Sequence, residues 1–336
     1  MRLSLFGSLL ALRSHRYSNR KSVTRRTIFI SWIASHGRSV ALAEQLGTEV
    51  FFPPNQAFKG SLSIRYWCLS TWTCKLLLTT RPSAIICMQP PIPAVILCWL
   101  YCLLRPKTKL VADLHSGALN DPKWRWAQPL LRRILRGRAA IVTGSVYAQV
   151  VQNWGIKSFI IHDPLQLREL EARSLGEGGF FVCAAGWARD EPLHELVRAF
   201  HSLPYKLRIT GSMRYELDAP ENVVITGYLD NNAFDECLSQ SFAIISLTSR
   251  DETMQRGGYE ALERGKLLLT SDTRILREYF GPAAVYCTAN PVSIRLGVEE
   301  VVARQEELRS HVRALQERVQ VEGELSLQEL RRYLND

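Results

Sequence analysis

The segment 251–260, which reads DETMQRGGYE, contains the densest group of residues that could do chemistry. That group consists of Glu252, Arg256, Gly257, Gly258 and Glu260. The two glutamates are separated by seven residues, so one carboxylate can precede a helix while the other lies about one turn inside it. The glycines let backbone amides approach a phosphate at the positive helix end, and the arginine adds a planar cation for the same anion. Carboxylates accept hydrogen bonds from sugar hydroxyls, so the spacing fits a ribose and a hexose, although an ordinary acidic helix start would also produce it.

Two loops in the first half of the chain carry a second group of such residues. The first loop, after an apolar run over 27–31, contains His36, Gly37, Arg38 and Ser39. The second loop contains Asp113 and His115 and follows an apolar run over 109–113. The imidazole of His115 could hydrogen-bond a hydroxyl or steady developing charge, and Asp113 could orient that ring or act as a base. A capped helix start and a structural Asp–His pair would give the same pattern.

Motifs of several large enzyme classes are missing from the sequence. No GxGxxG follows the first predicted strand, and the stretch from Gly258 to Lys266 fails the spacing of a phosphate-binding P-loop. There is no HExxH and no clear DxD pair for a nucleotide-bound divalent metal. The eight cysteines form no CxxC pair and mostly lie in apolar runs, which favours buried thiols in a reducing compartment. Dehydrogenase, kinase and NTPase functions are therefore not expected, and no metal or other cofactor is expected either.

Alternating strands and helices must position these residues. In the first half, strands are predicted over 27–31, 48–52, 84–88, 109–113, 139–143 and 158–161, with helices over 38–46, 61–79, 92–104, 124–135 and 145–154. In the second half, strands are predicted over 180–184, 206–210, 223–226, 242–246, 267–270 and 284–288, with helices over 193–202, 231–239, 257–265, 273–280 and from 291 onward. Strand, helix, strand at this spacing predicts parallel sheets with right-handed crossovers.

The predicted fold class is therefore α/β, with two Rossmann-like doubly wound domains that face each other across a cleft. The expected divisions are a basic N-terminal extension over 1–26, a first domain over 27–164, a linker over 165–179, a second domain over 180–310 and a helical tail over 311–336. Ligands of such sheets bind beyond the carboxyl ends of the strands. Both groups of candidate residues fall in loops at those ends.

Residues 242–288 resemble the donor half of retaining glycosyltransferases with the two-Rossmann (GT-B) fold, family four. In that family, two glutamates seven residues apart lead into a helix with small residues and then a strand. Here Glu260 is followed by Ala261, by Gly265 and by an apolar run. The segments ITGS and NVVITGY, at 209–212 and 222–228, are similar to two further stretches of the family.

The resemblance implies a role for each matched residue. Glu252 would contact the transferred sugar and Glu260 would hold the nucleotide ribose. The nucleotide pocket would be lined by residues at Gly211, Ser212 and Tyr228. The loop over 36–39 would lie over the donor phosphates and the acceptor, and the histidine two residues after Asp113 would lie near the reacting sugar, with Asp113 as the base if transfer inverts.

The sequence departs from the family at one place. Family members usually have an arginine and a lysine after the first strand of the second domain, where they bind the diphosphate. Here that stretch contains Arg189, and acids occupy the next two positions. The resemblance then implies that Arg256, Arg189 and helix-end amides stabilise the leaving diphosphate without a metal, with Arg38 as a further candidate.

The charge is unevenly distributed along the chain. Residues 1–26 carry a net charge of +7, residues 27–178 carry +9 and residues 179–336 carry −6. A basic, Trp-rich first half can face anionic lipid. Basic and aromatic residues also bracket an apolar helix predicted over 127–135, which can either lie in a lipid interface or pack on the sheet. We therefore expect a cytoplasmic protein with peripheral contact to an anionic membrane, and no nucleic-acid partner.

These observations predict an enzyme, a hexosyltransferase-type and retaining glycosyltransferase. It would move a sugar from a nucleotide-sugar, bound as a co-substrate, to a saccharide or a lipid-linked acceptor in cell-surface polysaccharide or glycolipid synthesis. Two alternatives fit the same fold. One is a non-catalytic sugar- or lipid-binding partner of a glycan assembly complex, favoured by the missing lysine after Arg189. The other is a nucleotide-sugar epimerase or a phosphorolytic enzyme.

Overall fold

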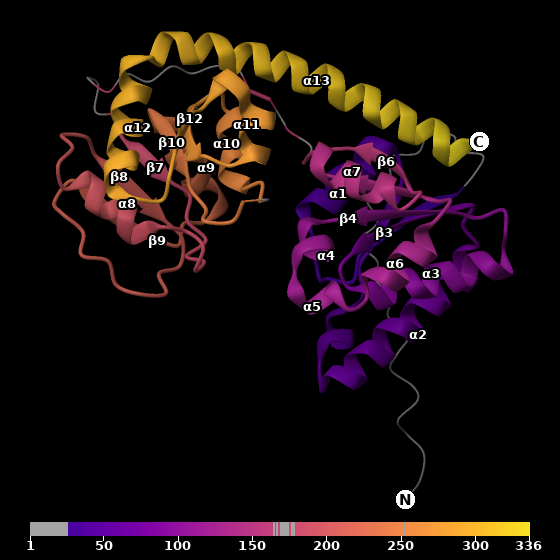
Figure 1. Cartoon of the computed structure of the whole chain (residues 1–336). Coiled ribbons are helices and arrows are strands. Elements are labelled where there is room, and N and C mark those ends of the chain that lie inside the picture. Colours follow the sequence, from indigo (N-terminus) through magenta and orange to yellow (C-terminus); the bar gives the residue numbers. More distant parts are fainter. Residues whose placement is uncertain (1–25, 164, 166, 169–174, 176–178, 252) are drawn as a thin grey trace, which may run out of the picture. The chain divides into compact units, whose positions relative to one another are not determined.

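The chain divides into two compact α/β units (Figure 1). The computed structural model describes residues 26–163, 165, 167, 168, 175, 179–251 and 253–336. Of these, the residues up to 163 and those over 325–336 belong to the first unit, and the others belong to the second. Each unit has its own parallel sheet and its own buried core.

The first unit is built on a parallel sheet with the strand order β2-β1-β3-β4-β5-β6. Its strands are β1 (Thr27–Ile30), β2 (Glu49–Phe51), β3 (Ala84–Gln89), β4 (Lys109–Leu114), β5 (Ala139–Val142) and β6 (Lys157–Ile160). Every residue of the central strand β3 is buried, as expected for a parallel strand that is covered on both faces.

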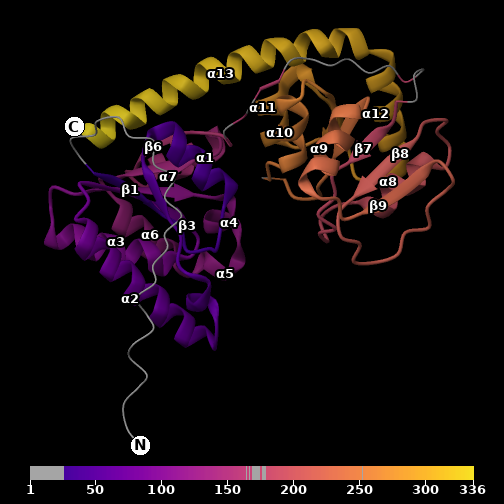
Figure 2. The same cartoon turned by 180° about the vertical axis from the view of Figure 1, so that it is seen from behind.

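Helices cover both faces of this sheet. They are α1 (Gly37–Leu46), α2 (Leu62–Thr80), α3 (Ile92–Leu104), α4 (Ser116–Asn120), α5 (Pro122–Arg125), α6 (Gln128–Leu135) and α7 (Ser145–Asn153). Figures 1 and 2 show α2, α3 and α6 together on one side of the sheet, where α3 packs against the other two. Leu42 and Ala43 of α1 pack on the opposite face, against Phe29 and Ile86 of the sheet.

The second unit repeats this architecture with the strand order β12-β11-β10-β7-β8-β9. Its strands are β7 (Phe181–Cys183), β8 (Leu207–Thr210), β9 (Val223–Gly227), β10 (Ala243–Ser246), β11 (Leu267–Ser271) and β12 (Val285–Cys287). Its helices are α8 (Leu193–Phe200), α9 (Asn231–Gln240), α10 (Arg256–Glu263), α11 (Arg274–Phe280), α12 (Pro291–Ala303) and the first part of α13 (Gln305–Asn335). All strand pairs that the structure describes are parallel, so the prediction of two Rossmann-like α/β domains is confirmed.

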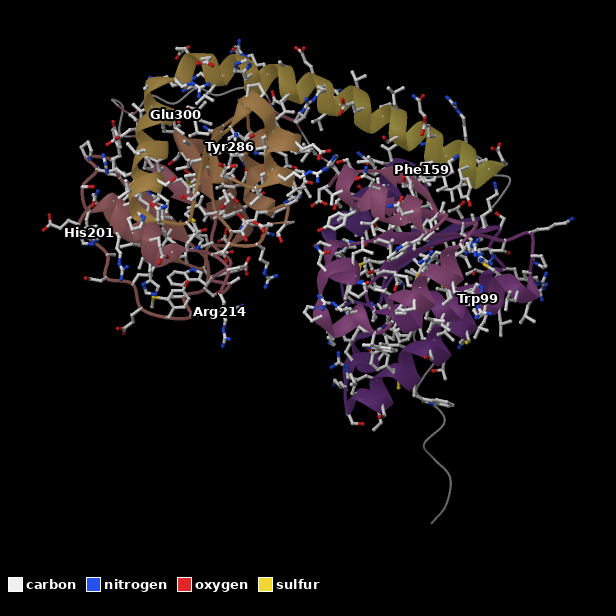
Figure 3. All side chains as sticks on the ribbon, viewed as in Figure 1. Trp99, Phe159, His201, Arg214, Tyr286 and Glu300 are labelled. Carbon is white, nitrogen blue, oxygen red and sulfur yellow. The ribbon has the colours of Figure 1, made fainter. Side chains whose placement is uncertain are left out.

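The helix α13 contributes to both cores. The sequence predicts a helical tail from residue 311, and the structure has one helix from Gln305 to Asn335. Its apolar residues Leu327, Leu330 and Leu334 are buried in the core of the first unit. The aromatic ring of Tyr333 lies 5.6 Å from that of Phe159, which is labelled in Figure 3 beneath the last turns of the helix. These turns therefore complete the first unit.

The helix predicted over 127–135 packs on the protein. In α6 the apolar side chains of Leu131, Ile134 and Leu135 are buried, so they are not available to enter a lipid layer. Within the described residues 122–135, the large exposed apolar side chains are those of Trp126 and Leu130. No helix in the described part of the chain combines the length and apolar composition needed to cross a bilayer. All eight cysteines are free thiols.

Candidate functional site

A cavity of about 420 Å³ opens at the carboxyl edge of the sheet in the second unit. Its walls come from the loops that follow β7, β8, β9 and β10 and from the first turns of α10. The residues that line the cavity include Gly186, Glu191, Gly211, Tyr228, Arg256 and Glu260. Parallel strands bring these loops together because all of their carboxyl ends lie at one edge.

The loops after β7 and β8 are held against each other by backbone contact. Gly211 has a φ of +96°, and a Cβ built there would lie 2.0 Å from the carbonyl oxygen of Ala185. The indole of Trp187 donates from Nε1 to the carbonyl oxygen of Thr210 over 3.0 Å. Glycine is therefore required at 211 by both conformation and space, and this part of the cavity wall is rigid.

The loop after β7 is tied down by the carboxylate of Glu191. The amides of Gly186 and Trp187 donate to its two oxygens over 3.1 and 2.9 Å. Trp187 itself has a left-handed φ of 55°, which costs about 1–2 kcal/mol for a residue with a Cβ. Burial raises the pKa of Glu191, although the loop amides favour its charged form. In the sequence, Glu191 is only one of the two acids that follow Arg189, where the family resemblance predicts a cation. The signal that could have identified it is a carboxylate a few residues after a glycine at a strand end.

The helix α10 presents its N-terminus to the cavity through Arg256 and Gly257. A Cβ at Gly257 would lie 2.8 Å from the Oγ of Ser246, so a glycine lets the helix approach β10 closely. Gly258 points elsewhere: a Cβ there would lie 2.7 Å from the ring of Phe280 in α11. The two adjacent glycines thus have different surroundings, and only Gly257 lines the cavity.

Glu260 lies one turn into α10 and faces the cavity with a side chain that is 12% exposed. Burial raises the pKa of its carboxyl, and the guanidinium of Arg256, with Nε 3.5 Å from Oε1, opposes that rise. A largely desolvated carboxylate beside a cation is a strong acceptor for ligand hydroxyl groups.

The remaining residues predicted in the second unit are distributed differently. Tyr228 lines the cavity and is 75% exposed, so one ring face is available to a flat ligand. Arg189 and Ser212 are exposed and are not among the residues of the cavity wall. Among the described lining residues, Arg256 is the one cation. Glu252 lies outside the described residues.

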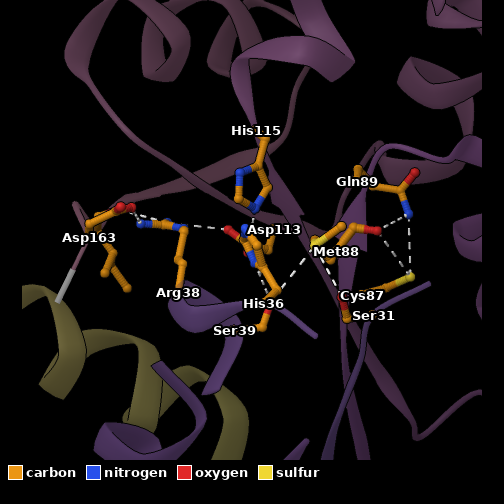
Figure 4. Close-up of polar contacts among 11 residues, drawn as sticks. Ser31, His36, Arg38, Ser39, Cys87, Met88, Gln89, Asp113, His115 and Asp163 are labelled. Carbon is orange, nitrogen blue, oxygen red and sulfur yellow. Dashed lines mark hydrogen bonds and ion pairs between the residues drawn. The ribbon is translucent and has the colours of Figure 1, made fainter. Parts of the chain in front are cut away.

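A second cluster of polar side chains lies at the carboxyl edge of the sheet in the first unit (Figure 4). The carboxylate of Asp113, at the end of β4, is fully buried. Arg38 of α1 donates from Nη2 to Asp113 Oδ1 over 3.3 Å and from Nη1 to Asp163 Oδ1 over 2.8 Å. His115 donates from Nε2 to Asp113 Oδ2 over 3.2 Å. One buried carboxylate therefore holds both the guanidinium and the imidazole.

The charges of this cluster define what each group can do. Burial opposes ionisation of Asp113, but Arg38 and His115 outweigh it and hold the pKa of the carboxyl well below its usual range. Asp113 is therefore suited to orienting His115 and poorly suited to taking up a proton. Arg38 has a side chain that is 4% exposed and is engaged by two carboxylates, so it is not presented to a ligand phosphate.

His36 completes the cluster. Its Nδ1 lies 2.9 Å from Ser39 Oγ, and its ring lies 5.1 Å from that of His115. Burial and the neighbouring His115 lower the pKa of His36, which favours the neutral imidazole. Gly37 begins α1, and a Cβ there would meet nothing within 4 Å. Asp163 is not among the site residues predicted from the sequence. The feature that could have identified it is its position just after the strand that precedes the linker.

Comparisons with known proteins establish the fold. No protein-family model and no curated protein sequence matches the chain. Among solved structures, a glycosyltransferase from Rickettsia africae ESF-5 is 11% identical, has a TM-score of 0.68 and covers 93% of this chain and 99% of its own. Anabaena HepE in complex with UDP and glucose is 13% identical, with a TM-score of 0.68 and coverage of 92% and 99%. Sucrose-phosphate synthase from Thermosynechococcus elongatus is 14% identical, with a TM-score of 0.68 and coverage of 91% and 97%. The chain has the GT-B fold. In this fold, the polar cluster of the first unit and the cavity of the second unit each lie at the carboxyl edge of a sheet.

The close approach at Gly211 predicts a large effect on stability. Gly227, in the same unit, also has a positive φ of +72°, but a Cβ there would meet nothing within 4 Å. We expect Gly227→Ala to cost about 1–2 kcal/mol for its left-handed backbone. Gly211→Ala should cost at least about 2 kcal/mol more, because it adds overpacking against a backbone carbonyl. Chemical denaturation of the two variants measures the difference, and equal losses would contradict the contact.

The buried Asp113 predicts a specific dependence of stability on pH. Its pKa is lower in the folded than in the unfolded protein, so its stabilising contribution is present above about pH 4 and is lost as the pH falls further. We expect Asp113→Asn to reduce the free energy of unfolding by on the order of 2–3 kcal/mol at pH 7. The difference from the native protein should shrink below about pH 4, where the Asp113 carboxyl takes up a proton in the unfolded state while it keeps its charge in the folded state. A difference that stays constant in acid would show that another group carries this dependence.

Proposed function

We propose that this protein is a glycosyltransferase that transfers a sugar from a nucleotide-sugar to a saccharide or lipid-linked acceptor. The observation that carries the proposal is the cavity of the second unit, where a partly buried carboxylate, a cation and an exposed aromatic ring come together in a GT-B fold. These are the groups needed to bind a ribose hydroxyl, a phosphate and a base. The Anabaena HepE structure, which contains UDP and glucose, supports a donor of this class.

Each lining residue then has a role in donor binding. Glu260 accepts hydrogen bonds from the ribose hydroxyls, and Tyr228 stacks on the base. Arg256 and the first amides of α10 bind the diphosphate, because a helix N-terminus carries partial positive charge. Glu191 holds the wall against which the nucleotide lies. The departing diphosphate is stabilised by these charges, with Arg189 added from its exposed loop.

The polar cluster of the first unit serves the acceptor. His115 is the most exposed member that reaches Asp113, with a side chain that is 24% exposed. It hydrogen-bonds the attacking hydroxyl, while Asp113 fixes its ring orientation. Arg38 and Asp163 are positioning residues, because Arg38 holds the carboxylate of Asp113 and Asp163 holds Arg38. His36 and Ser39 form the neighbouring wall.

The wider proposal follows the family resemblance. Transfer is retaining and of the hexosyltransferase type, with Glu252 at the transferred sugar. The enzyme works in the cytoplasm at the inner face of the membrane, in the synthesis of a cell-surface polysaccharide or glycolipid. A basic first half and an acidic second half of the chain are compatible with that location.

Donor binding is tested by thermal shift with a panel of UDP-, GDP-, ADP- and dTDP-sugars. One nucleotide class should stabilise the protein by binding the folded state. Glu260→Ala should weaken that binding by about tenfold or more, since a hydrogen bond to a charged group contributes about 1.5–3 kcal/mol. The matched control is Glu299→Ala, which removes a carboxylate from a similar i,i+4 ion pair on α12. No shift with any nucleotide would overturn the transferase proposal and favour a non-catalytic partner of a glycan assembly complex.

The acceptor role is tested in a donor-turnover assay with His115→Ala. We expect nucleotide release to fall by about a hundredfold, the usual lower range for losing a positioned acid–base group. The thermal shift with the donor should stay unchanged, because His115 does not line the cavity. His201→Ala, at the exposed end of α8 in Figure 3, is the control histidine. Loss of donor binding in His115→Ala would contradict the separation of the two roles.

A further inference from the structure

The helix α2 exposes an apolar stripe on its outer side. Of its 19 residues, only Leu69, Thr73 and Leu77 are buried, and they form the side that faces the protein. The outer side carries Ile64, Trp67 and Leu78, of which Trp67 is 71% exposed. A surface helix normally turns mostly charged residues to water, whereas the exposed residues of α2 include these large apolar side chains and a single charge, that of Lys75. An exposed apolar stripe of this kind marks an interaction surface.

The stripe continues onto α3. Leu100, Leu103 and Leu104 near the end of that helix are also exposed, and α2 packs along α3. The segments that follow the two helices lie together, because Thr108 Oγ1 donates to the carbonyl oxygen of Pro82 over 3.2 Å. Figures 1 and 2 both show α2 at the margin of the first unit. We call the surface formed by the six exposed residues Ile64, Trp67, Leu78, Leu100, Leu103 and Leu104 the α2–α3 face.

The charge around the α2–α3 face has one sign. Between Glu49 and Asp113 the sequence contains no aspartate or glutamate. The same stretch contains seven basic residues: Lys59, Arg65, Lys75, Arg81, Arg105, Lys107 and Lys109. Lys75 on α2, Arg81 just after α2, and Arg105 and Lys107 after α3 are exposed. A surface that combines leucine, isoleucine and tryptophan with cations only is complementary to lipid tails beneath anionic headgroups.

We propose that the α2–α3 face docks on the surface of an anionic lipid bilayer, with α2 lying in the interface. Two copies of this face would bring like charges together, which disfavours self-association as the reason for its exposure. The proposal assigns lipid contact to α2 and α3 in place of the helix predicted over 127–135, whose apolar side is buried. Trp67 suits the interface, because its indole has an apolar body and a polar N–H.

The docking surface also leads to the candidate acceptor site. The indole of Trp32, which follows β1, donates from Nε1 to Thr73 Oγ1 of α2 over 2.8 Å. The ring of Tyr66, in the first half of α2, lies 6.1 Å from that of Trp32. Four residues after Trp32 the same loop reaches His36. On the basis of the function proposed above, this arrangement presents the His36–His115 cluster to an acceptor held by the membrane.

The test is sedimentation of the full chain with vesicles of phosphatidylcholine, alone or with about a third phosphatidylglycerol. We expect binding to the anionic vesicles only, and weaker binding as salt is added, because the cations are screened. The double variant Trp67→Glu with Leu78→Glu should bind these vesicles about tenfold more weakly or worse, since charges are costly where the apolar side chains enter the interface. The matched control, Val292→Glu with Leu296→Glu, changes two exposed apolar residues of α12 and should bind as the native protein does.

Three results would overturn the proposal. One is absence of binding to anionic vesicles, and another is equal binding by the α2 variant and the native protein. The third is a native dimer, seen by light scattering, that the α2 variant dissociates, because a second copy would then cover the face. The nucleotide thermal shift of each variant reports folding and donor binding separately. A variant that no longer binds vesicles but still shows the nucleotide-induced thermal shift supports membrane docking, whatever the acceptor is. If the native protein shows no nucleotide-induced shift, that result bears on the transferase proposal alone.

Discussion

Parallel pairing is the constraint on which the rest of this structure depends. Because the strands of each sheet run the same way, every loop that follows a strand leaves at one edge. In the second unit this edge gathers the loops of Gly186, Gly211 and Tyr228 with the start of α10. In the first unit it gathers Asp113 at the end of β4 and Asp163 after β6 around Arg38 of α1. Both sites are thus assembled from residues far apart in the chain.

Burial favours the neutral form of each carboxylate at these edges, and the partners of each one decide the direction in which its pKa moves. Asp113 is fully buried yet strongly acidic, because Arg38 and His115 supply the hydrogen bonds and charge that water would otherwise supply. Glu260 and Glu191 are also removed from water, but their partners compensate less, and burial raises their pKa values. Asp113 is therefore a structural anion that stays charged, whereas the carboxylate of Glu260 is less fully compensated by its partners. That contrast supports the roles proposed above, in which Asp113 orients His115 and Glu260 binds the donor.

The sequence predicts the fold well because it depends on local signals. Apolar runs of four or five residues separated by helical patterns are sufficient to indicate parallel sheets. Of the predicted residues, Glu260, Arg256, Gly257 and Tyr228 all line the cavity in the second unit. Contacts that depend on the tertiary arrangement are not visible in this way. The neighbour of Gly258 is Phe280 in another helix, and the partners of Arg38 lie 75 and 125 positions away. The same limit applies to the helix predicted over 127–135, since its composition cannot show which side the sheet covers.

In the first unit, alternate residues of β3 face opposite sides of the sheet, and the two sides pack against different helices. Along this strand Ala84, Ile86 and Met88 belong to the core beneath α1 and α13, and the sulfur of Met88 accepts a hydrogen bond from Ser31 of the β1 loop. The intervening residues, such as Cys87, point to the other face, where α3 lies. One face of the sheet therefore supports buried charges that need exclusion of water and fixed hydrogen bonds. The other packs against helices with few charges, whose exposed apolar residues form the surface for which we propose lipid contact. A shift of β3 by one residue would exchange the two sets of side chains, so the register of this buried strand fixes which of its residues pack beneath α1 and which pack beneath α3.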